Sequence, residues 1–236
     1  MPFTPTKHAT LTLCLAGLLA GAAAPVRAEL GGTVSLQSDA RDRGLSYSRD
    51  RPQAQLTLAW DGSTGWYAGG LLSRARFDAQ RGSGFVQAYA GRVVELAPGL
   101  GLEAGLQYTR FPSISRYDFG EAYAGLIGDR WAARLHYADD YYGNGHRSVY
   151  GELNLDWPLR GTLTALAHAG VLAGRSDALY DSGRGDARID TRLGLAWRVQ
   201  ALELQLSWSS VSAGGPYTWV SESHRQTVVL GVSASF

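Results

Sequence analysis

Along most of the chain, apolar and polar residues alternate with the period of two that is typical of a β-strand with one buried face. The final segment is a clear example, because Val228, Leu230 and Val232 share one face while Gly231 and Ser233 share the other. Alternation of this kind recurs in twelve segments, which we predict as strands: 33–39, 53–60, 66–77, 85–96, 100–109, 119–127, 131–137, 149–157, 162–173, 189–198, 202–209 and 226–236.

The connections between these segments alternate in length. Tight turn sequences such as 61–65 and 97–99 follow even-numbered strands, whereas odd-numbered strands lead into longer polar stretches such as 41–52 and 174–187. An even number of strands of about ten residues, with short turns at one rim and long loops at the other, is typical of barrels of the bacterial outer membrane. We therefore predict an all-β protein that forms a single antiparallel transmembrane β-barrel of about 12 strands, with both termini periplasmic.

Tryptophan placement favours the membrane over water. Under this topology, five of the seven tryptophans lie at periplasmic strand ends, together with the terminal Phe236: Trp60, Trp66, Trp131, Trp157 and Trp197. Such a set is typical of an aromatic girdle at a membrane interface. A soluble lipocalin-like barrel or a β-sandwich would also show alternation, but it would explain neither the one-ended tryptophans nor the unequal loops. The terminal aromatic is similar to the signal that the barrel-assembly machinery reads.

The N-terminal residues 1–28 are predicted to be a secretory signal peptide. An uncharged apolar run follows Lys7 and ends before a small-residue cleavage pattern at 26–28. The run is shorter than the ~20 residues that a spanning helix needs, and no comparable run follows it. Cys14 lacks the small preceding residue of a lipoprotein site, so we expect no lipidation. Residues 29–236 would then form the barrel.

Charge and composition restrict the expected partners. The 22 basic residues include Lys7 and Arg27 of the signal peptide, which leaves 20 in the mature chain against 21 Asp and Glu. This near-neutral balance argues against a nucleic-acid partner, for which a basic stripe is expected. The absence of cysteine from the mature chain weighs against a small disulfide-stapled scaffold and against thiol metal sites, and we predict no metal and no cofactor. The expected partners are outer-membrane lipid, the barrel-assembly machinery and small polar solutes, and the sequence sets no oligomeric state.

If the apolar phase faces lipid, the polar phase faces the lumen, because an arginine at mid-depth on the lipid side would cost about 2–4 kcal/mol. Twelve strands lie between the eight or so that side chains fill and the larger barrels that enclose wide channels, so we expect a narrow pore for small polar solutes or ions. The alternative is a plug of paired inward charges. The phase of segment 85–96 is undetermined. The candidate pore-lining residues are Arg74, Arg76, Glu103, Gln107, Glu121, Arg134, His136, Glu152, Asn154, Asp156, Asp190, Arg192, Arg198, Glu203 and Gln205.

Four candidate rim residues lie where the seventh strand meets its exterior loop: Asp139, Asp140, Tyr141 and Tyr142. One interpretation makes the aspartates a calcium or solute site at the pore mouth. The simpler interpretation, which we favour, is that the carboxylates accept hydrogen bonds from the loop backbone while the tyrosines belong to the exterior aromatic girdle.

Five short motifs carry a family resemblance. They are 38–46 (Ser-Asp-Ala-Arg-Asp-Arg-Gly-Leu-Ser), 66–69 (Trp-Tyr-Ala-Gly), 89–91 (Tyr-Ala-Gly), 121–126 (Glu-Ala-Tyr-Ala-Gly-Leu) and 137–143 (Tyr-Ala-Asp-Asp-Tyr-Tyr-Gly). In order and spacing they resemble the TorF-type porins of the proteobacterial outer membrane, also called the Gcw_chp family. Ala40 departs from the family pattern, in which an aromatic residue is usual. The resemblance implies an outer-membrane barrel with a channel role, and it supplies no substrate-binding residues.

Two other functions compete with a channel. A lipid-modifying outer-membrane enzyme would need a serine and a histidine on the outer face. His136 and His168 instead lie in the inward phase, and no Gly-x-Ser-x-Gly sequence occurs, so we predict no catalytic residues. The other alternative is a closed barrel with a structural or adhesive role, which would use the loops 174–187 and 211–225.

Deleting Phe236 tests the predicted assembly signal. We expect the deletion to impair assembly in cells far more than it lowers the stability of barrel refolded in detergent, because a signal is needed only during insertion. The measurements are the amount of folded barrel in outer-membrane fractions and the denaturant midpoint of the refolded protein. Equal damage in both settings would argue against a signal role.

Overall fold

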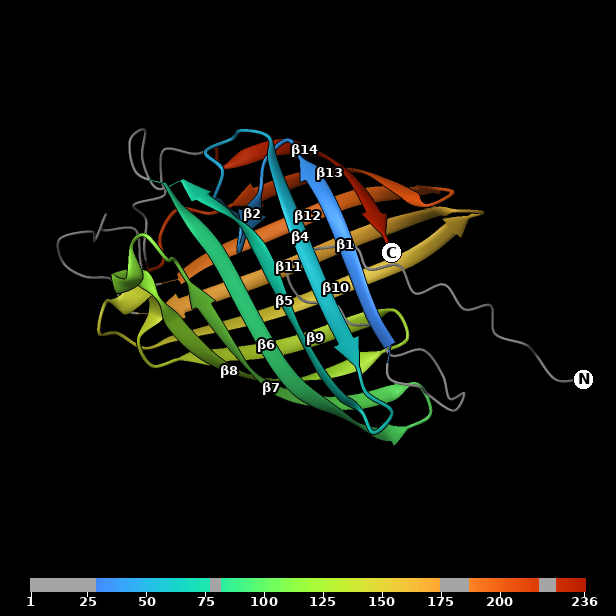
Figure 1. Ribbon diagram of the computed structural model, residues 1–236, viewed down its shortest axis with the longest axis horizontal. Coiled ribbons are helices and arrows are strands. Elements are labelled where there is room, and N and C mark those ends of the chain that lie inside the picture. The colour runs from blue at the N-terminus through green and yellow to red at the C-terminus, as the bar shows by residue number, and fades with distance from the viewer. Residues whose placement is uncertain (1–28, 77–81, 175–186, 217–223) are drawn as a thin grey trace, which may run out of the picture.

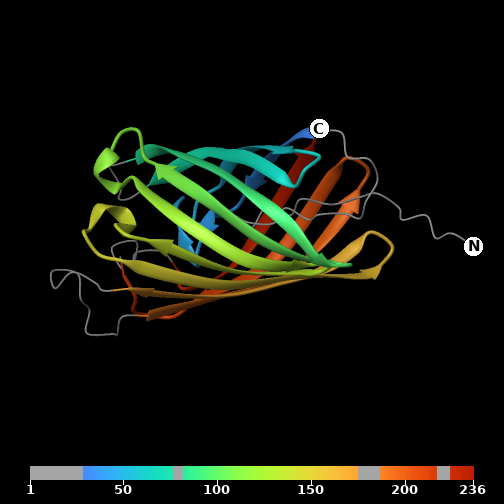
Figure 2. The same cartoon turned by 90° about the horizontal axis from the view of Figure 1, so that it is seen from below.

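Twelve long strands close into one antiparallel barrel, and two short strands form a separate pair (Figures 1 and 2). This computed structural model describes residues 29–76, 82–174, 187–216 and 224–236, so the predicted signal peptide lies outside the described residues. The predicted fold class and strand number are confirmed. The barrel strands are β1 (Glu29–Gln37), β4 (Gln53–Asp61), β5 (Trp66–Arg76), β6 (Gly82–Ala97), β7 (Leu100–Arg110), β8 (Phe119–Gly128), β9 (Trp131–Ala138), β10 (Ser148–Arg160), β11 (Leu163–Gly174), β12 (Ala187–Val199), β13 (Leu202–Val211) and β14 (Gln226–Ser235).

The other elements lie in connections. The short strands β2 (Arg41–Asp42) and β3 (Leu45–Ser46) belong to the connection between β1 and β4. Two single-turn 3₁₀ helices, η1 (Ser115–Tyr117) and η2 (Tyr141–Gly143), lie in the connections after β7 and β9. Neither helix is long or apolar enough to cross a membrane, and the described residues contain no other helix that is.

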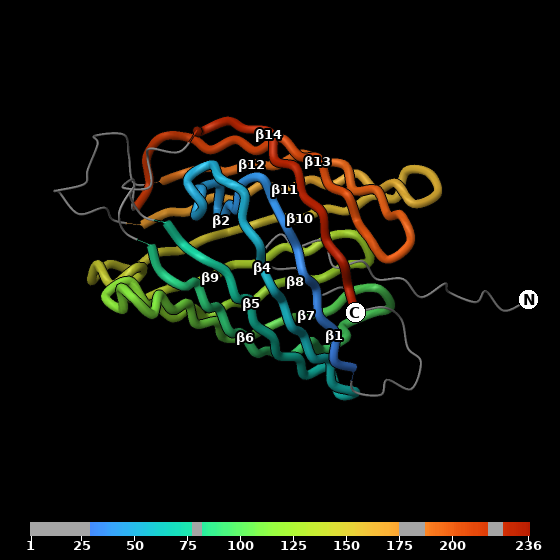
Figure 3. The backbone as a smooth tube through the Cα atoms, turned by 45° about the horizontal axis from the view of Figure 1, so that its top comes forward, coloured from blue at the N-terminus to red at the C-terminus, as the bar shows by residue number. Residues whose placement is uncertain are grey.

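The barrel closes where β14 pairs with β1, which lies between β14 and β4 (Figure 3). Leu36 pairs with Val232 and Thr33 with Ser235 in this seam. Phe236 extends the pairing, because its backbone N–H donates to the Gly32 carbonyl at 2.9 Å and its carbonyl accepts from the Gly32 N–H at 3.0 Å. Closure leaves no exposed strand edge, which a bilayer would not tolerate.

The outer surface of the barrel is apolar. Leucines on several strands are strongly exposed, as in Leu106 on β7 at 66%, Leu135 on β9 at 58% and Leu193 on β12 at 56%. A monomer in water rarely exposes a contiguous apolar patch above a few hundred Å². A continuous apolar wall is instead what the hydrocarbon core of a bilayer requires, so the outward face is the lipid face.

Aromatic residues border this wall at both ends. Trp60, Trp66, Trp157, Trp197 and Phe236 are exposed at the predicted periplasmic rim. At the opposite rim, the exposed aromatic side chains in the described strands are Tyr108, Tyr137 and Trp208. The exterior girdle therefore differs from the predicted one, which contained Tyr141 and Tyr142.

Inward tyrosines lie over glycines of the neighbouring strand, which explains the repeated Tyr-Ala-Gly sequences. Tyr67 pairs with Gly91, and a Cβ atom at Gly91 would overlap the Tyr67 hydroxyl and lie 2.7 Å from the Ala104 carbonyl oxygen. Gly105 is covered in the same way by Tyr123. The glycines give the phenol rings room to lie across the barrel wall. These pairs also fix the phase of β6, which the sequence leaves undetermined, since Tyr89 covers Gly69 from the inside.

Replacing Gly91 by alanine should lower stability by about 1–3 kcal/mol, the usual cost of overpacking. The added methyl group would displace the Tyr67 ring and meet backbone. The matched control is Gly231→Ala, whose Cβ would make only ordinary contacts, the nearest at 3.7 Å. Denaturant unfolding of both variants in detergent checks the expectation, and equal midpoints would contradict it.

Candidate functional site

The connection between β1 and β4 folds into the barrel rather than outward. Arg41 pairs with Ser46 and Asp42 with Leu45, which makes a two-residue hairpin turn at Arg43 and Gly44. Both turn residues have positive φ, 47° and 76°, as a tight type I′ turn requires. We call residues 41–46 the inward hairpin. The expectation that 41–52 forms an exterior loop is wrong for this segment.

A single carboxylate organises the base of the inward hairpin. Asp39 accepts hydrogen bonds from Arg41 Nε at 2.5 Å, from Ser46 Oγ at 2.5 Å and from Ser48 Oγ at 2.8 Å. Arg41 also contacts Asp50 at 2.9 Å. These bonds involve Asp39, Arg41 and Ser46 of the 38–46 motif, and they hold the base of the inward hairpin together.

The tip residue Arg43 crosses the lumen to the opposite wall. Its Nη2 donates to both oxygens of Glu121 on β8, at 2.8 and 2.7 Å. Its guanidinium lies 4.3 Å from the ring centre of Tyr150 on β10 and 5.4 Å from that of Tyr141. The Arg43 and Glu121 side chains are only 7% and 2% exposed. Although burial by itself would lower the pKa of Arg43, the Glu121 carboxylate raises that pKa above its ordinary value, so the tip stays charged.

An aromatic cluster packs beside the hairpin at the end of the lumen that we predict to be exterior. It consists of buried rings that contact one another: Tyr47, Phe85, Phe111, Phe119, Tyr141 and Tyr142. Tyr142 has φ 58° and ψ 31°, a left-handed conformation that helps to turn this segment inward. Placing Tyr141 and Tyr142 in the exterior girdle is therefore wrong, because their rings pack around the hairpin and not against lipid.

The neighbouring aspartates stay at the rim. Asp140 accepts a hydrogen bond from the Gly145 backbone N–H at 2.6 Å, as the simpler interpretation expects. Asp139 is exposed and contacts Arg147 Nε at 3.1 Å. In these contacts both carboxylates interact with residues of the rim loop, Gly145 and Arg147.

Two networks of charged residues line the wall below the hairpin. In the first, Arg134 donates to Glu103 at 2.6 Å and lies 3.8 Å from Glu152, which is 3.5 Å from His136. Tyr67 donates to Glu103 as well. Burial of these side chains strengthens each attraction but demands that every charge be matched.

The second network lies on β10 to β12. His168 bonds Asp190 through Nε2 at 2.8 Å and Asn154 through Nδ1 at 2.7 Å. The Tyr150 hydroxyl lies 3.1 Å from the same Nε2. Tyr150 contacts Arg43 of the inward hairpin, so His168 connects the hairpin, through Tyr150, to Asp190 on the barrel wall.

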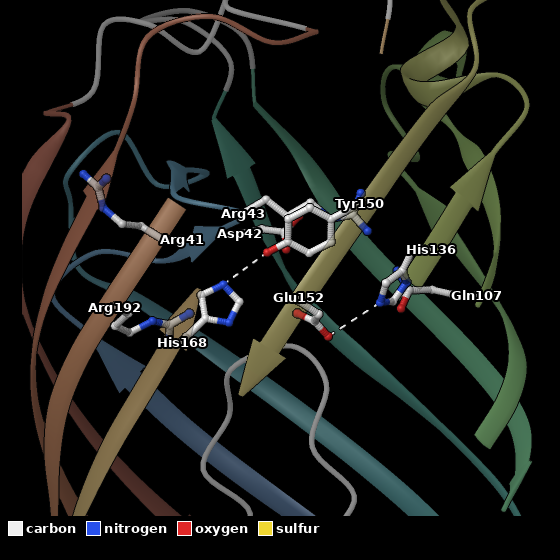
Figure 4. A pocket seen from close by; sticks show the side chains of 9 residues that line it. All are labelled: Arg41, Asp42, Arg43, Gln107, His136, Tyr150, Glu152, His168 and Arg192. Carbon is white, nitrogen blue, oxygen red and sulfur yellow. Dashed lines mark hydrogen bonds and ion pairs between the residues drawn. The ribbon is translucent and has the colours of Figure 1, made fainter. Parts of the chain in front are cut away.

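A small cavity lies between the hairpin and these networks (Figure 4). Its volume is about 20 Å³, room for roughly one or two water-sized groups. Asp42 lines this cavity. Burial raises the pKa of its carboxyl group to about 6; Arg43 opposes this rise, and nearby carboxylates add to it. The lining residues are Arg41, Asp42, Arg43, Gln107, His136, Tyr150, Glu152, His168 and Arg192.

The alternation of burial places all but two of the predicted pore-lining residues on the lumen face. Arg74 and Arg76 are the exceptions and the prediction is wrong for them. In β5 the inward phase is Tyr67, Leu71 and Ala75, which pack against inner side chains, while Arg74 shares the outward phase of exposed Leu72. The cavity residues that the prediction omits are Arg41, Asp42, Arg43, Tyr150 and His168. For Arg41, Asp42 and Arg43 the sequence offers one indication, which is the concentration of polar residues in the motif at 38–46.

The two histidines of the barrel strands point into the lumen, away from the lipid face. His136 and His168 are 6% and 8% exposed at the side chain and face the lumen. Among the hydrogen bonds of the described residues, neither histidine has a serine hydroxyl as partner. A serine–histidine mechanism on the outer face therefore gains no support from their positions.

A closed twelve-stranded barrel with an apolar exterior and a polar, loop-filled lumen defines a porin-like transmembrane β-barrel. Within that class, the chain belongs to the Gcw_chp family, described as bacterial protein of unknown function, which matches residues 19–236. The narrower TorF-type label stays a prediction. No curated protein matches the sequence.

Solved porins share the fold at low sequence identity. A KdgM porin is 14% identical, with 88% of this chain and 98% of that chain covered and a TM-score of 0.53. A NanC porin is 12% identical, with 87% and 99% covered and a TM-score of 0.57. A KdgM porin in complex with disordered oligogalacturonate is 14% identical, with 88% and 98% covered and a TM-score of 0.50.

Glu121→Gln tests the lock at the hairpin tip. Removing one partner of a buried ion pair typically costs about 3–5 kcal/mol, because the other charge is left buried. We expect the hairpin to leave its site, which trypsin cleavage after the hairpin arginines would detect. The control, Arg147→Gln, breaks an ion pair whose side chains are both 77% exposed, and it should change stability by less than about 1 kcal/mol. Equal protease resistance in both variants would contradict the lock.

Proposed function

We propose that the chain is a channel of the bacterial outer membrane that passes small polar solutes or ions through the barrel lumen. The observation that carries the proposal is the occupant of that lumen. It is a hairpin of the chain itself, held at its tip by the Arg43–Glu121 ion pair and by packing, without a covalent link. A loop held in this way narrows a barrel and sets which solutes pass.

Barrel size supports this function. Eight strands leave an interior that side chains fill, and width grows roughly linearly with strand number. Twelve strands therefore enclose more space than wall side chains need, and the inward hairpin and aromatic cluster take up part of it. Neutral polar residues line β1, β4 and β13, including Thr33, Thr57 and Ser207, which gives a solute hydrogen-bonding groups on that side.

The likeness to porins supports the same class. One KdgM porin was solved in complex with disordered oligogalacturonate, and for this chain we take from it only the transport of polar solutes. Outer-membrane lipid and the barrel-assembly machinery are the partners that this function requires.

One observation favours a second candidate, a closed barrel with a structural or adhesive role. The lumen charges largely pair with one another, and the remaining cavity is only about 20 Å³. In that case the hairpin would be a permanent plug. A lipid-modifying enzyme is less well supported, since both strand histidines lie inside the barrel.

Planar-bilayer recording of the refolded protein separates these functions. A channel should give a small ohmic conductance that rises several-fold in Arg43→Ser, because the hairpin loses its anchor. Arg74→Ser removes the same charge from the outer face and should leave the conductance unchanged. Arg192→Glu should shift ion selectivity towards cations, since it reverses a charge in the lumen.

Correctly folded barrel that carries no current, with or without Arg43, would contradict the channel and favour the closed barrel. Hydrolysis of lipid that is lost in His136→Ala would instead favour the enzyme. Folding is checked for each variant by its heat-dependent shift in gel mobility.

A further inference from the structure

The outward face of the described barrel strands carries four charged side chains, and all four are arginines: Arg74, Arg76, Arg92 and Arg110. The acidic residues of these strands all fall in the inward phase. An arginine on the lipid side costs about 2–4 kcal/mol at mid-depth but only about 0–1 kcal/mol near an interface. The position of each arginine along its strand therefore decides what it contacts.

Three of the four lie near one another at the predicted exterior rim. Arg74 and Arg76 are the last outward residues of β5, and Arg110 ends β7. These two strands flank β6 in the barrel wall (Figure 1). The outward residue that precedes Arg110 is Tyr108, which is 51% exposed and belongs to the aromatic border of this rim. Aromatic belts lie at the level of the lipid headgroups, so these three side chains, which we call the rim arginines, lie at or beyond that level.

The rim arginines have few partners within the described part of the chain. There the side chains of Arg74 and Arg76 make neither an ion pair nor a hydrogen bond. Arg110 Nε lies 3.7 Å from Asp118 Oδ2, and the arginine side chain is 60% exposed. The other oxygen of Asp118 accepts the Phe111 backbone N–H at 2.7 Å. Because an exposed ion pair contributes at most about 1 kcal/mol, the rim arginines remain available to a partner outside the chain.

The strand between them leaves space for such a partner. Arg74 pairs in register with Gly84 and Arg76 with Gly82, so no side chain of β6 stands beside these two arginines on the outer face. Two strand spacings, about 10 Å, separate β5 from β7. Arginine side chains that extend from both strands can therefore contact one headgroup lying over the glycines.

We propose that the rim arginines bind the phosphate groups of an anionic glycolipid in the outer leaflet. A guanidinium group presents a fork of donors that matches phosphate oxygens. A phosphate monoester carries a charge of about −1.5 to −2, so a headgroup with two of them balances three arginines better than the single charge of a phospholipid phosphodiester does. The acyl chains would lie against the apolar wall below, where Leu72 and Leu106 are exposed. The inference rests on the proposed outer-membrane function, because that function sets which leaflet this rim faces.

Lipid binding is measured by native mass spectrometry on the barrel refolded in detergent, with diphosphoryl lipid A as the probe. We expect bound glycolipid, with an affinity that falls about tenfold or more in Arg76→Gln, because one charged hydrogen-bonding partner is lost. Arg110→Gln, on the other side of β6, should weaken binding in the same way. The matched control is Arg92→Gln. It removes an outward arginine at the other rim, where Arg92 lies 5.4 Å from the ring centre of Trp66, and it should bind as the unchanged protein does.

Four results would overturn the site: no bound glycolipid, equal affinity in all three variants, equally tight binding of phosphatidylglycerol, or displacement of the glycolipid by equimolar inorganic phosphate. Planar-bilayer recording keeps this inference separate from the proposed function. Glycolipid binding by a barrel that carries no current would leave the lipid site standing and contradict the channel. Current without glycolipid binding would contradict the lipid site alone.

Discussion

A strand that crosses a bilayer sends half of its side chains towards lipid and half into the lumen, so a charged group at mid-depth of the strand is accommodated far better inside than outside. Inward arginines, carboxylates and histidines then require partners, since an unmatched buried charge is far more costly than a matched one. In this barrel the demand is met by connected pairs such as Arg134–Glu103 and His168–Asp190, and by a segment that is not part of the wall at all. The inward hairpin supplies Arg43 to Glu121, which otherwise lacks an arginine partner in the described chain.

The hairpin and the wall therefore stabilise each other. The Arg43 guanidinium donates to the Glu121 carboxylate and lies over the ring of Tyr150. Tyr150 in turn contacts His168 of the second network. Wall, hairpin and cavity form one connected polar unit, and the buried aromatic cluster packs beside it. A solute that crosses the barrel has to pass this polar unit.

Much of the fold is predictable from the sequence because each strand face meets a different solvent. Period-two alternation separates lipid from lumen residues, and the prediction succeeds for charged residues such as Glu103, Arg134 and Asp190. It is wrong for Arg74 and Arg76 because the inward face of β5 is itself apolar where it contacts inner side chains. Alternation shows that two faces differ and leaves open which of two mixed faces points inward.

The interior of the lumen is less accessible to such reasoning. Arg43 and Glu121 are 78 positions apart, and no local pattern links them. A polar loop that folds inward has the same composition as one that stays in water, and tyrosines such as Tyr142 suit a girdle or a core equally well. The motif at 38–46 marks the segment as unusual, but only the contacts of Asp39 and Arg43 show why.

The inward course of residues 41–46 also changes how this connection tolerates sequence change. Connections that run over a protein surface tolerate substitutions and insertions because few contacts fix them. Here Arg43, Gly44 and Ser46 are all buried, so a new side chain at any of these positions has to fit the space inside the barrel. The segment is therefore constrained as a core residue is, although it lies in a connection between two strands.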